Sequence, residues 1–144
     1  MMFLLLAIGV AGFTQTGEEA AVKNVLNSYK QAIEKLDTTG VVNLFIKESK
    51  IFEQASDEGT IGYYLEHHLG PELKEFKSFT FSNYKVDITL AGDYAFSTET
   101  YIYTIVLPKD SKEIKSQGVA TSVLKKTKDG WKIVQTHSSF RKAK

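Results

Sequence analysis

Hydrophobic positions follow two different periods along this chain, and the change between them falls near residue 77. In the first half, one apolar stripe recurs at steps of three and four residues, at Val22, Val25, Leu26, Tyr29, Ile33 and Leu36. This spacing predicts an amphipathic helix over residues 17–36. Thr16 and Glu19 form a capping-box pattern at its start. Two shorter helical patterns, at 41–45 and 60–70, flank a predicted short strand at 49–54.

Beyond residue 77 the apolar residues alternate with polar ones, which is typical of half-buried strands. The alternation predicts four strands, at 78–90, 94–107, 114–128 and 131–140. A phase slip at Ser82-Asn83 predicts a β-bulge, which bends a sheet. Turn residues between neighbouring strands favour an antiparallel meander. The predicted fold class is therefore α+β: three N-terminal helices against a curved antiparallel sheet, forming a cone that encloses a pocket.

The first residues have the composition of a processing segment. An apolar run over 3–11 is too short to span a membrane, and small residues followed by Thr14, Gln15 and Thr16 come after it. This pattern predicts a signal peptide at 1–16, ahead of a single domain at 17–144. Export to the periplasm or the exterior follows from that prediction. No Lys or Arg precedes the run, and a buried N-terminal helix or strand is the alternative.

Composition narrows the chemistry more than the fold. The chain has 144 residues and no cysteine, which excludes disulfides, Cys-ligated metal sites and thiol catalysis. The net charge of +1 divides into an acidic half, residues 18–80 at −4, and a basic half, residues 81–144 at +5. Because the basic residues are spread out and include one Arg, no nucleic-acid partner is expected.

The end of the chain carries the most specific motif. The Asp129-Gly130-Trp131 hairpin leads into a strand that continues through His137 to Ser139. With the order of elements before it, over about residues 18–140, this resembles the nuclear transport factor 2-like superfamily, in its SnoaL-like and ketosteroid-isomerase-like branches. The resemblance implies a cystatin-like α+β roll. It does not select a function, because this fold hosts isomerases, cyclases, dehydratases, transport factors and oligomerisation modules.

Two positions depart from that resemblance. Related domains often carry His where this chain has Gln135, and kinase-type association domains carry a pocket Arg where Ser122 stands. No Asp of the ketosteroid-isomerase kind can be placed on a pocket-facing strand position. Without the pocket Arg that Ser122 replaces, a carboxylate on a ligand would lack its expected partner.

Similarity to the family assigns one face of each long strand to the pocket. These faces combine small and polar side chains, which favours a cavity over a solid core. The predicted ligand-binding residues are His68, Ser97, Ser122, Gln135, Tyr29 and Trp131. For Tyr29 and Trp131 the alternative is simple packing, which is the more frequent role of such aromatic residues.

Glu99, His137 and Tyr101 are the candidate catalytic residues. A carboxylate on a central strand is costly to bury alone, so Glu99 either faces solvent or pairs with His137 or a tyrosine. An acid–imidazole pair can act as a general base, with Tyr101 as acid or oxyanion donor. A purely structural hydrogen-bonded pair is the alternative.

His68 lies on the apolar stripe of the third predicted helix. With His137 and either Glu53 or Glu99 it has the ligand types of a metal site, but no local spacing supports one, and no metal or cofactor is predicted. The alternative is a histidine that interacts with the carbonyls at the helix end.

Three functions remain open from the sequence. The first is binding of a small, partly apolar molecule in the cone, and the second is an isomerase, cyclase or hydrolase without a cofactor. The third is a homodimer formed through the outer sheet face, at Thr98, Thr100, Thr104, Thr121 and Thr136 beside Phe96, Ile102, Val119 and Val123. No membrane contact is expected after cleavage of the signal peptide.

Overall fold

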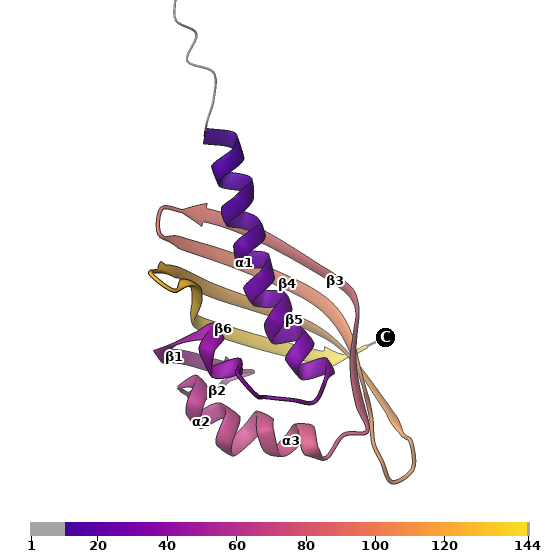
Figure 1. Ribbon diagram of the computed structural model, residues 1–144. Coiled ribbons are helices and arrows are strands. Elements are labelled where there is room, and N and C mark those ends of the chain that lie inside the picture. The colour runs from indigo at the N-terminus through magenta and orange to yellow at the C-terminus, as the bar shows by residue number, and fades with distance from the viewer. Residues whose placement is uncertain (1–10, 144) are drawn as a thin grey trace, which may run out of the picture.

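The computed structural model describes residues 11–143, with side chains from residue 16 onward. One six-stranded sheet runs in the order β2-β1-β6-β5-β4-β3, and helix α1 crosses its concave side (Figure 1). The four long strands β3 (Ser78–Ala91), β4 (Tyr94–Val106), β5 (Glu113–Thr127) and β6 (Gly130–Lys142) form the predicted antiparallel meander. The α+β class and the curved, open sheet are confirmed.

Helix α1 (Ala11–Glu34) begins earlier than its apolar stripe suggests. The predicted start at Thr16 is wrong, because the helix continues through Thr16 and Glu19 without a break. Glu19 instead pairs with Lys23 one turn later, at 2.6 Å. The predicted signal peptide at 1–16 lies largely outside the described residues, and export stays a prediction.

The segment between α1 and the meander is more extended than predicted. The 3-10 turn η1 (Val41–Leu44) leads into β1 (Phe45–Glu53), which is longer than the predicted strand and pairs in parallel with β6. A further short strand, β2 (Ser56–Gly59), pairs with β1. Sequence patterns miss β2 because its four residues carry no apolar alternation.

The third predicted helix is three consecutive elements, α2 (Ile61–Tyr64), η2 (Leu65–Leu69) and α3 (Gly70–Lys74). The Thr60 side chain caps α2 by accepting the backbone amide of Tyr63. The predicted stop at Gly70-Pro71 is wrong, because η2 is a π-turn whose last amide, at Gly70, donates to the carbonyl of Leu65. A Cβ at Gly70 would meet that oxygen at 2.2 Å, so glycine is what lets the helix continue into α3.

The predicted bulge in β3 is confirmed. The β3–β4 register shifts between Ser82 and Lys85, and Asn83 has a positive φ of 51°. Glu34, near the end of α1, accepts the backbone amide of Phe81 at 3.0 Å, which ties the helix to the strand beside the bulge.

A second bulge, in β6, was not predicted. Ile133 pairs with Leu124 and Gln135 pairs with the next residue, Val123, so Val134 is an extra residue in the ladder. A one-residue insertion reverses the face of every later side chain. Trp131 and Ile133, before the bulge, point inward. After the bulge it is Thr136 that points inward and is buried.

A group of almost completely buried residues lies where α1 covers the sheet. We call this the packed end and define it by Val22, Ala95, Leu124 and Ile133. Within the described residues, no helix is long and apolar enough to cross a membrane.

Candidate functional site

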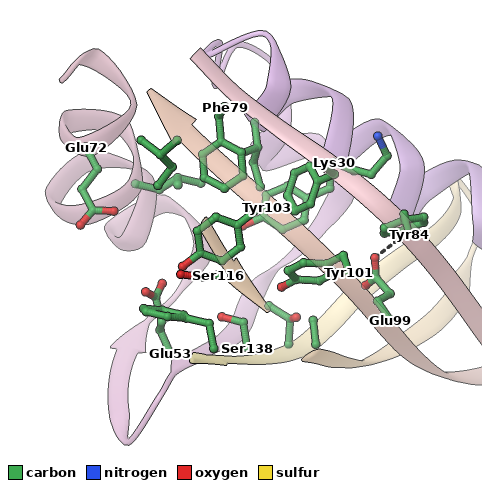
Figure 2. Close-up of a pocket in the computed structure, with 18 of the residues that line it drawn as sticks. Lys30, Glu53, Glu72, Phe79, Tyr84, Glu99, Tyr101, Tyr103, Ser116 and Ser138 are labelled. Carbon is green, nitrogen blue, oxygen red and sulfur yellow. Dashed lines mark hydrogen bonds between the residues drawn. The ribbon is translucent and has the colours of Figure 1, made fainter. Parts of the chain in front are cut away.

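Beyond the packed end, the space between α1, α3 and the sheet is open. It forms a cavity of about 360 Å³, into which residues from α1, β1, the helical segment and all four long strands project (Figure 2). We call this region the hollow end and define it by Phe79, Phe81, Tyr101, Tyr103 and Phe140. The cavity that the sequence predicts is therefore present.

Aromatic rings form most of the hollow end. Phe79 stacks on Tyr103 with ring centroids 5.1 Å apart, and Phe81 meets Tyr101 edge-on at the same separation. Phe140 meets Tyr103 edge-on at 5.8 Å. Paired rings in these geometries hold one another in place, so the wall is preformed.

Gly118 makes room for Tyr101. The two residues are cross-strand partners in β4 and β5. A Cβ at Gly118 would lie 2.2 Å from the Tyr101 ring, so the ring lies flat over the glycine. This glycine therefore sets the position of a cavity-wall tyrosine.

Glu99 lines the cavity and is 8% exposed. The Tyr84 hydroxyl donates a hydrogen bond to its Oε2. Burial raises the pKa of Glu99, and the bond from Tyr84 opposes this only in part. Of the alternatives that the sequence left open, pairing with a tyrosine is the one observed.

A second carboxylate, Glu53 at the end of β1, accepts a hydrogen bond from the Tyr64 hydroxyl at 2.7 Å. Glu72 of α3 also lines the cavity, near His68. Burial raises the pKa of Glu72, and the nearby His68 works against that shift. Sequence reasoning missed Glu72 as a wall residue, and it named Glu53 only as a metal ligand.

His68 does not line the cavity, and two carboxylates hold it in place. Its Nδ1 lies 2.8 Å from Glu58 and its Nε2 lies 3.3 Å from Glu72. Burial lowers the pKa of His68, but the bond to Glu58 and the charges of Glu72 and Glu53 outweigh it, so the pKa is raised overall. His68 therefore lies at the surface beside the cavity and not in the wall where it was predicted.

His137 and Gln135 do not line this cavity, and their predicted place in its wall is wrong. Both follow the β6 bulge, which turns them to the outer face of the sheet. His137 Nε2 lies 2.8 Å from the backbone carbonyl of Gln54, so no Glu99–His137 pair forms. The same bulge removes Thr136 from the outer face that was predicted for dimerisation, and homodimerisation itself stays a prediction.

Trp131, Ser97 and Ser122 are inward-facing but belong to the packed region. The Trp131 Nε1 donates to Glu18 at 2.6 Å, and the Ser122 hydroxyl donates to Thr136 at 2.9 Å. The Ser97 hydroxyl is buried and has no hydrogen-bond partner. Together with Gln135 and outer-face residues, the two serines border a separate depression of about 300 Å³. Tyr29, by contrast, lines the main cavity as predicted.

The alternative metal site is not assembled. His68 and His137 contact different partners on different elements, and the described residues contain no group of three His, Asp or Glu side chains suited to hold a metal ion.

The identity of the tyrosine that pairs with Glu99 had a signal in the sequence. The hairpin at Gly92 sets the β3–β4 register, in which Val86 pairs with Glu99. Tyr84 is two residues further along the same face, within diagonal reach of Glu99. Nothing local predicts the contact between Glu53 and Tyr64, because the two residues meet only through the fold.

Comparison with known proteins agrees with this architecture. The family model for the SnoaL-like domain matches residues 22–142. The chain belongs to the SnoaL-like family. No curated protein matches this family member in sequence.

Solved structures place this SnoaL-like chain among nuclear transport factor 2-like proteins. A candidate ketosteroid isomerase from Shewanella frigidimarina is 30% identical, with a TM-score of 0.69 over 83% of this chain and 94% of that one. A candidate dehydratase from Streptomyces avermitilis has a TM-score of 0.78 at 19% identity, over 89% and 99% of the two chains. A protein with a cystatin-like fold from Novosphingobium aromaticivorans has a TM-score of 0.72 at 10% identity, over 90% and 85%. The last two likenesses concern the fold alone.

Proposed function

We propose that this SnoaL-like protein binds a small, planar, partly apolar molecule in the cavity at the hollow end. The observation that carries the proposal is the wall itself, in which stacked and edge-on rings surround about 360 Å³ while carboxyl and hydroxyl groups face inward. A preformed apolar cavity with a few polar groups is the usual form of a small-molecule site.

A matched pair of substitutions tests the proposal. Ala120 lines the cavity, whereas its neighbour Val119 points outward and is 39% exposed. Ala120→Phe should fill the cavity and weaken binding of a neutral probe, 2-naphthol, at least tenfold in an NMR titration. Val119→Phe adds a similar bulk on the opposite face and should leave binding unchanged. Equal binding to all three proteins would refute the cavity as the site.

Native mass spectrometry of protein purified from its own host gives an independent readout. A ligand that copurifies with the wild-type protein and is absent from the Ala120→Phe variant would support the proposal. A ligand retained by that variant would place binding elsewhere.

A second candidate function, acid–base catalysis, is favoured by one observation. Burial raises the pKa of Glu99 inside the cavity, and a carboxyl group with a raised pKa exchanges protons nearer to neutral pH. We propose Glu99 as the base and Tyr101, beside it on β4, as the hydrogen-bond donor to a developing oxyanion. The similarity to a candidate ketosteroid isomerase supports this choice of chemistry.

Deuterium exchange tests this second function. Glu99 would remove a proton from the carbon next to the carbonyl of 2-tetralone, and a deuteron from D2O would replace it. Glu99→Gln should abolish the catalysed exchange, while His137→Gln, on the outer face, should retain it. Exchange that survives in Glu99→Gln, or that is absent from the wild-type protein, would contradict the assignment.

A further inference from the structure

The charges around the cavity are unbalanced. Three carboxyl groups line it, on Glu53, Glu72 and Glu99, against one ammonium group, on Lys30. Lys30 is already paired, because its Nζ lies 2.6 Å from Glu34. Its positive charge is therefore largely cancelled before it can act on anything inside the cavity.

Two of these carboxyl groups lack a cationic partner. Among residues 16–143, neither Glu53 nor Glu99 forms an ion pair, and the hydrogen bond described for each comes from a tyrosine hydroxyl. A tyrosine hydroxyl supplies a proton donor but no positive charge. The cavity thus holds two carboxyl groups that no cation among the described residues pairs with.

The carboxyl groups occupy opposite ends of the aromatic wall. Figure 2 shows Glu53 and Glu72 on one side, Glu99 on the other, and the rings of Tyr101 and Tyr103 between them. The Lys30 ammonium points away from Glu53 and Glu72 in the same view. Burial raises the pKa of Tyr101 and of Tyr103, and the nearby charge of Glu53 adds to both shifts.

The aromatic rings, like the carboxyl groups, favour a positive charge in the cavity. The face of a ring carries partial negative charge and attracts cations that lie within about 6 Å of its centre. The wall already shows this behaviour, because the Lys30 Nζ lies 5.5 Å from the Phe81 centroid and 5.6 Å from that of Tyr84. An anion in the cavity would meet ring faces and carboxylates without an unpaired cation to receive it.

From this arrangement we propose that the ligand is an organic cation, a planar apolar group that carries a protonated amine or a quaternary ammonium. The ammonium lies between Glu53 and Glu72, against Tyr103, and the apolar body lies along Tyr101 and Phe81. This inference rests on the proposed binding function and deepens it, because it selects the charge of the ligand.

Three probes of matched shape test the charge preference. Benzyltrimethylammonium is the cation, neopentylbenzene is its neutral carbon isostere, and phenylacetate is an anion of similar size. Each is titrated into the full chain at pH 7.5 by ligand-observed NMR. We expect the cation to bind at least tenfold more tightly than the isostere, and the anion to bind most weakly.

Substitutions locate the preference within the cavity. Glu53→Gln keeps an acceptor for the Tyr64 hydroxyl but removes the charge, so it should reduce the cation's affinity about tenfold and leave the neutral isostere unaffected. Glu66→Gln is the matched control. Glu66 lies in the same helical segment with its side chain 76% exposed, outside the cavity wall, and its removal should change neither affinity.

Each outcome separates this inference from the binding function beneath it. Equal affinity for cation and isostere, or tighter binding of the anion, overturns the cationic ligand while the binding function stands. A cation preference that survives Glu53→Gln overturns the assigned position of the ammonium. If none of the three probes binds at millimolar concentration, the binding function falls as well.

Discussion

The packed end and the hollow end lie under the same helix and on the same sheet, yet they are built differently. At the packed end, small residues such as Ala95 and Ser97 are buried, and Val22 of α1 belongs to the same filled core. At the hollow end, large rings from neighbouring strands pack against one another and leave a cavity. Small side chains therefore belong to the filled part of the core, whereas large rings frame the empty space. The sequence predicts the opposite, namely that small residues make room for the pocket.

The largest effect that tests this comparison is expected on the free energy of unfolding. Leu124 is completely buried at the packed end, while Ile105 lines the cavity at the hollow end. Leu124→Ala should lower the free energy of unfolding by about 2–5 kcal/mol, the range for a large-to-small change in a close-packed core. Ile105→Ala removes similar volume beside existing empty space and should cost less than half as much. Urea denaturation of both variants gives the two values, and equal losses would mean that the two ends are packed alike.

The second test overfills the hollow end. Gly118→Ala places a methyl group against the Tyr101 ring and should cost about 1–3 kcal/mol, as overpacking commonly does. The displaced ring is expected to enter the cavity, so 2-naphthol should bind at least tenfold more weakly. Urea denaturation and the NMR titration measure the two effects. Adding Tyr101→Leu to the variant should recover the lost stability, and failure to recover it would show that the strain arises elsewhere.

The third test uses pH. Because burial raises the pKa of Glu99 above its ordinary value of 4.5, the folded state holds this proton more tightly than the unfolded chain does. The sign follows from proton linkage: stability falls as the pH rises from about 4.5 to the folded-state pKa, since ionisation occurs first in the unfolded chain. Glu99→Gln should therefore flatten the dependence of Tm on pH above 4.5 and raise Tm relative to the wild-type protein at neutral pH. Parallel pH profiles for the two proteins would contradict the assignment.

The smallest effect is expected at the outer face. His137→Ala removes one exposed hydrogen bond to the Gln54 carbonyl, which is worth about 1 kcal/mol or less. It should leave 2-naphthol binding unchanged, because the imidazole lies on the far side of the sheet. Any loss of binding beyond a factor of two in the same titration would return His137 to the site.

Most of the fold could be predicted because its signals are local. The four long strands, the β3 bulge and the helix stripe all follow from hydrophobic period and turn residues within a few positions. The site residues divide in the same way, into those with a local signal and those without one. Alternation puts Glu99 and Tyr101 on one face of their strand, but it was the resemblance to the family that assigned this face, with Tyr29, to the cavity wall.

The wrong predictions come from the extra residue Val134 in β6 and from contacts between residues that are far apart in the sequence. Val134 is apolar like Ile133 before it, so the alternation does not show which of the two is extra, and that ambiguity moved Gln135 and His137 to the wrong face. The polar ends of the site, Glu53 and Glu72, depend on β1 and α3 meeting across the cavity, which no local pattern encodes.

Glu18 has a consequence for how the chain can be trimmed. Its carboxylate receives both the indole of Trp131 and the ammonium of Lys126, at 2.6 and 2.7 Å, so the first half of α1 is joined to the final hairpin through this one side chain. A cut before residue 18 preserves both bonds, whereas a cut beyond it removes both. Limited proteolysis followed by mass spectrometry can show whether the folded chain resists trimming past this residue.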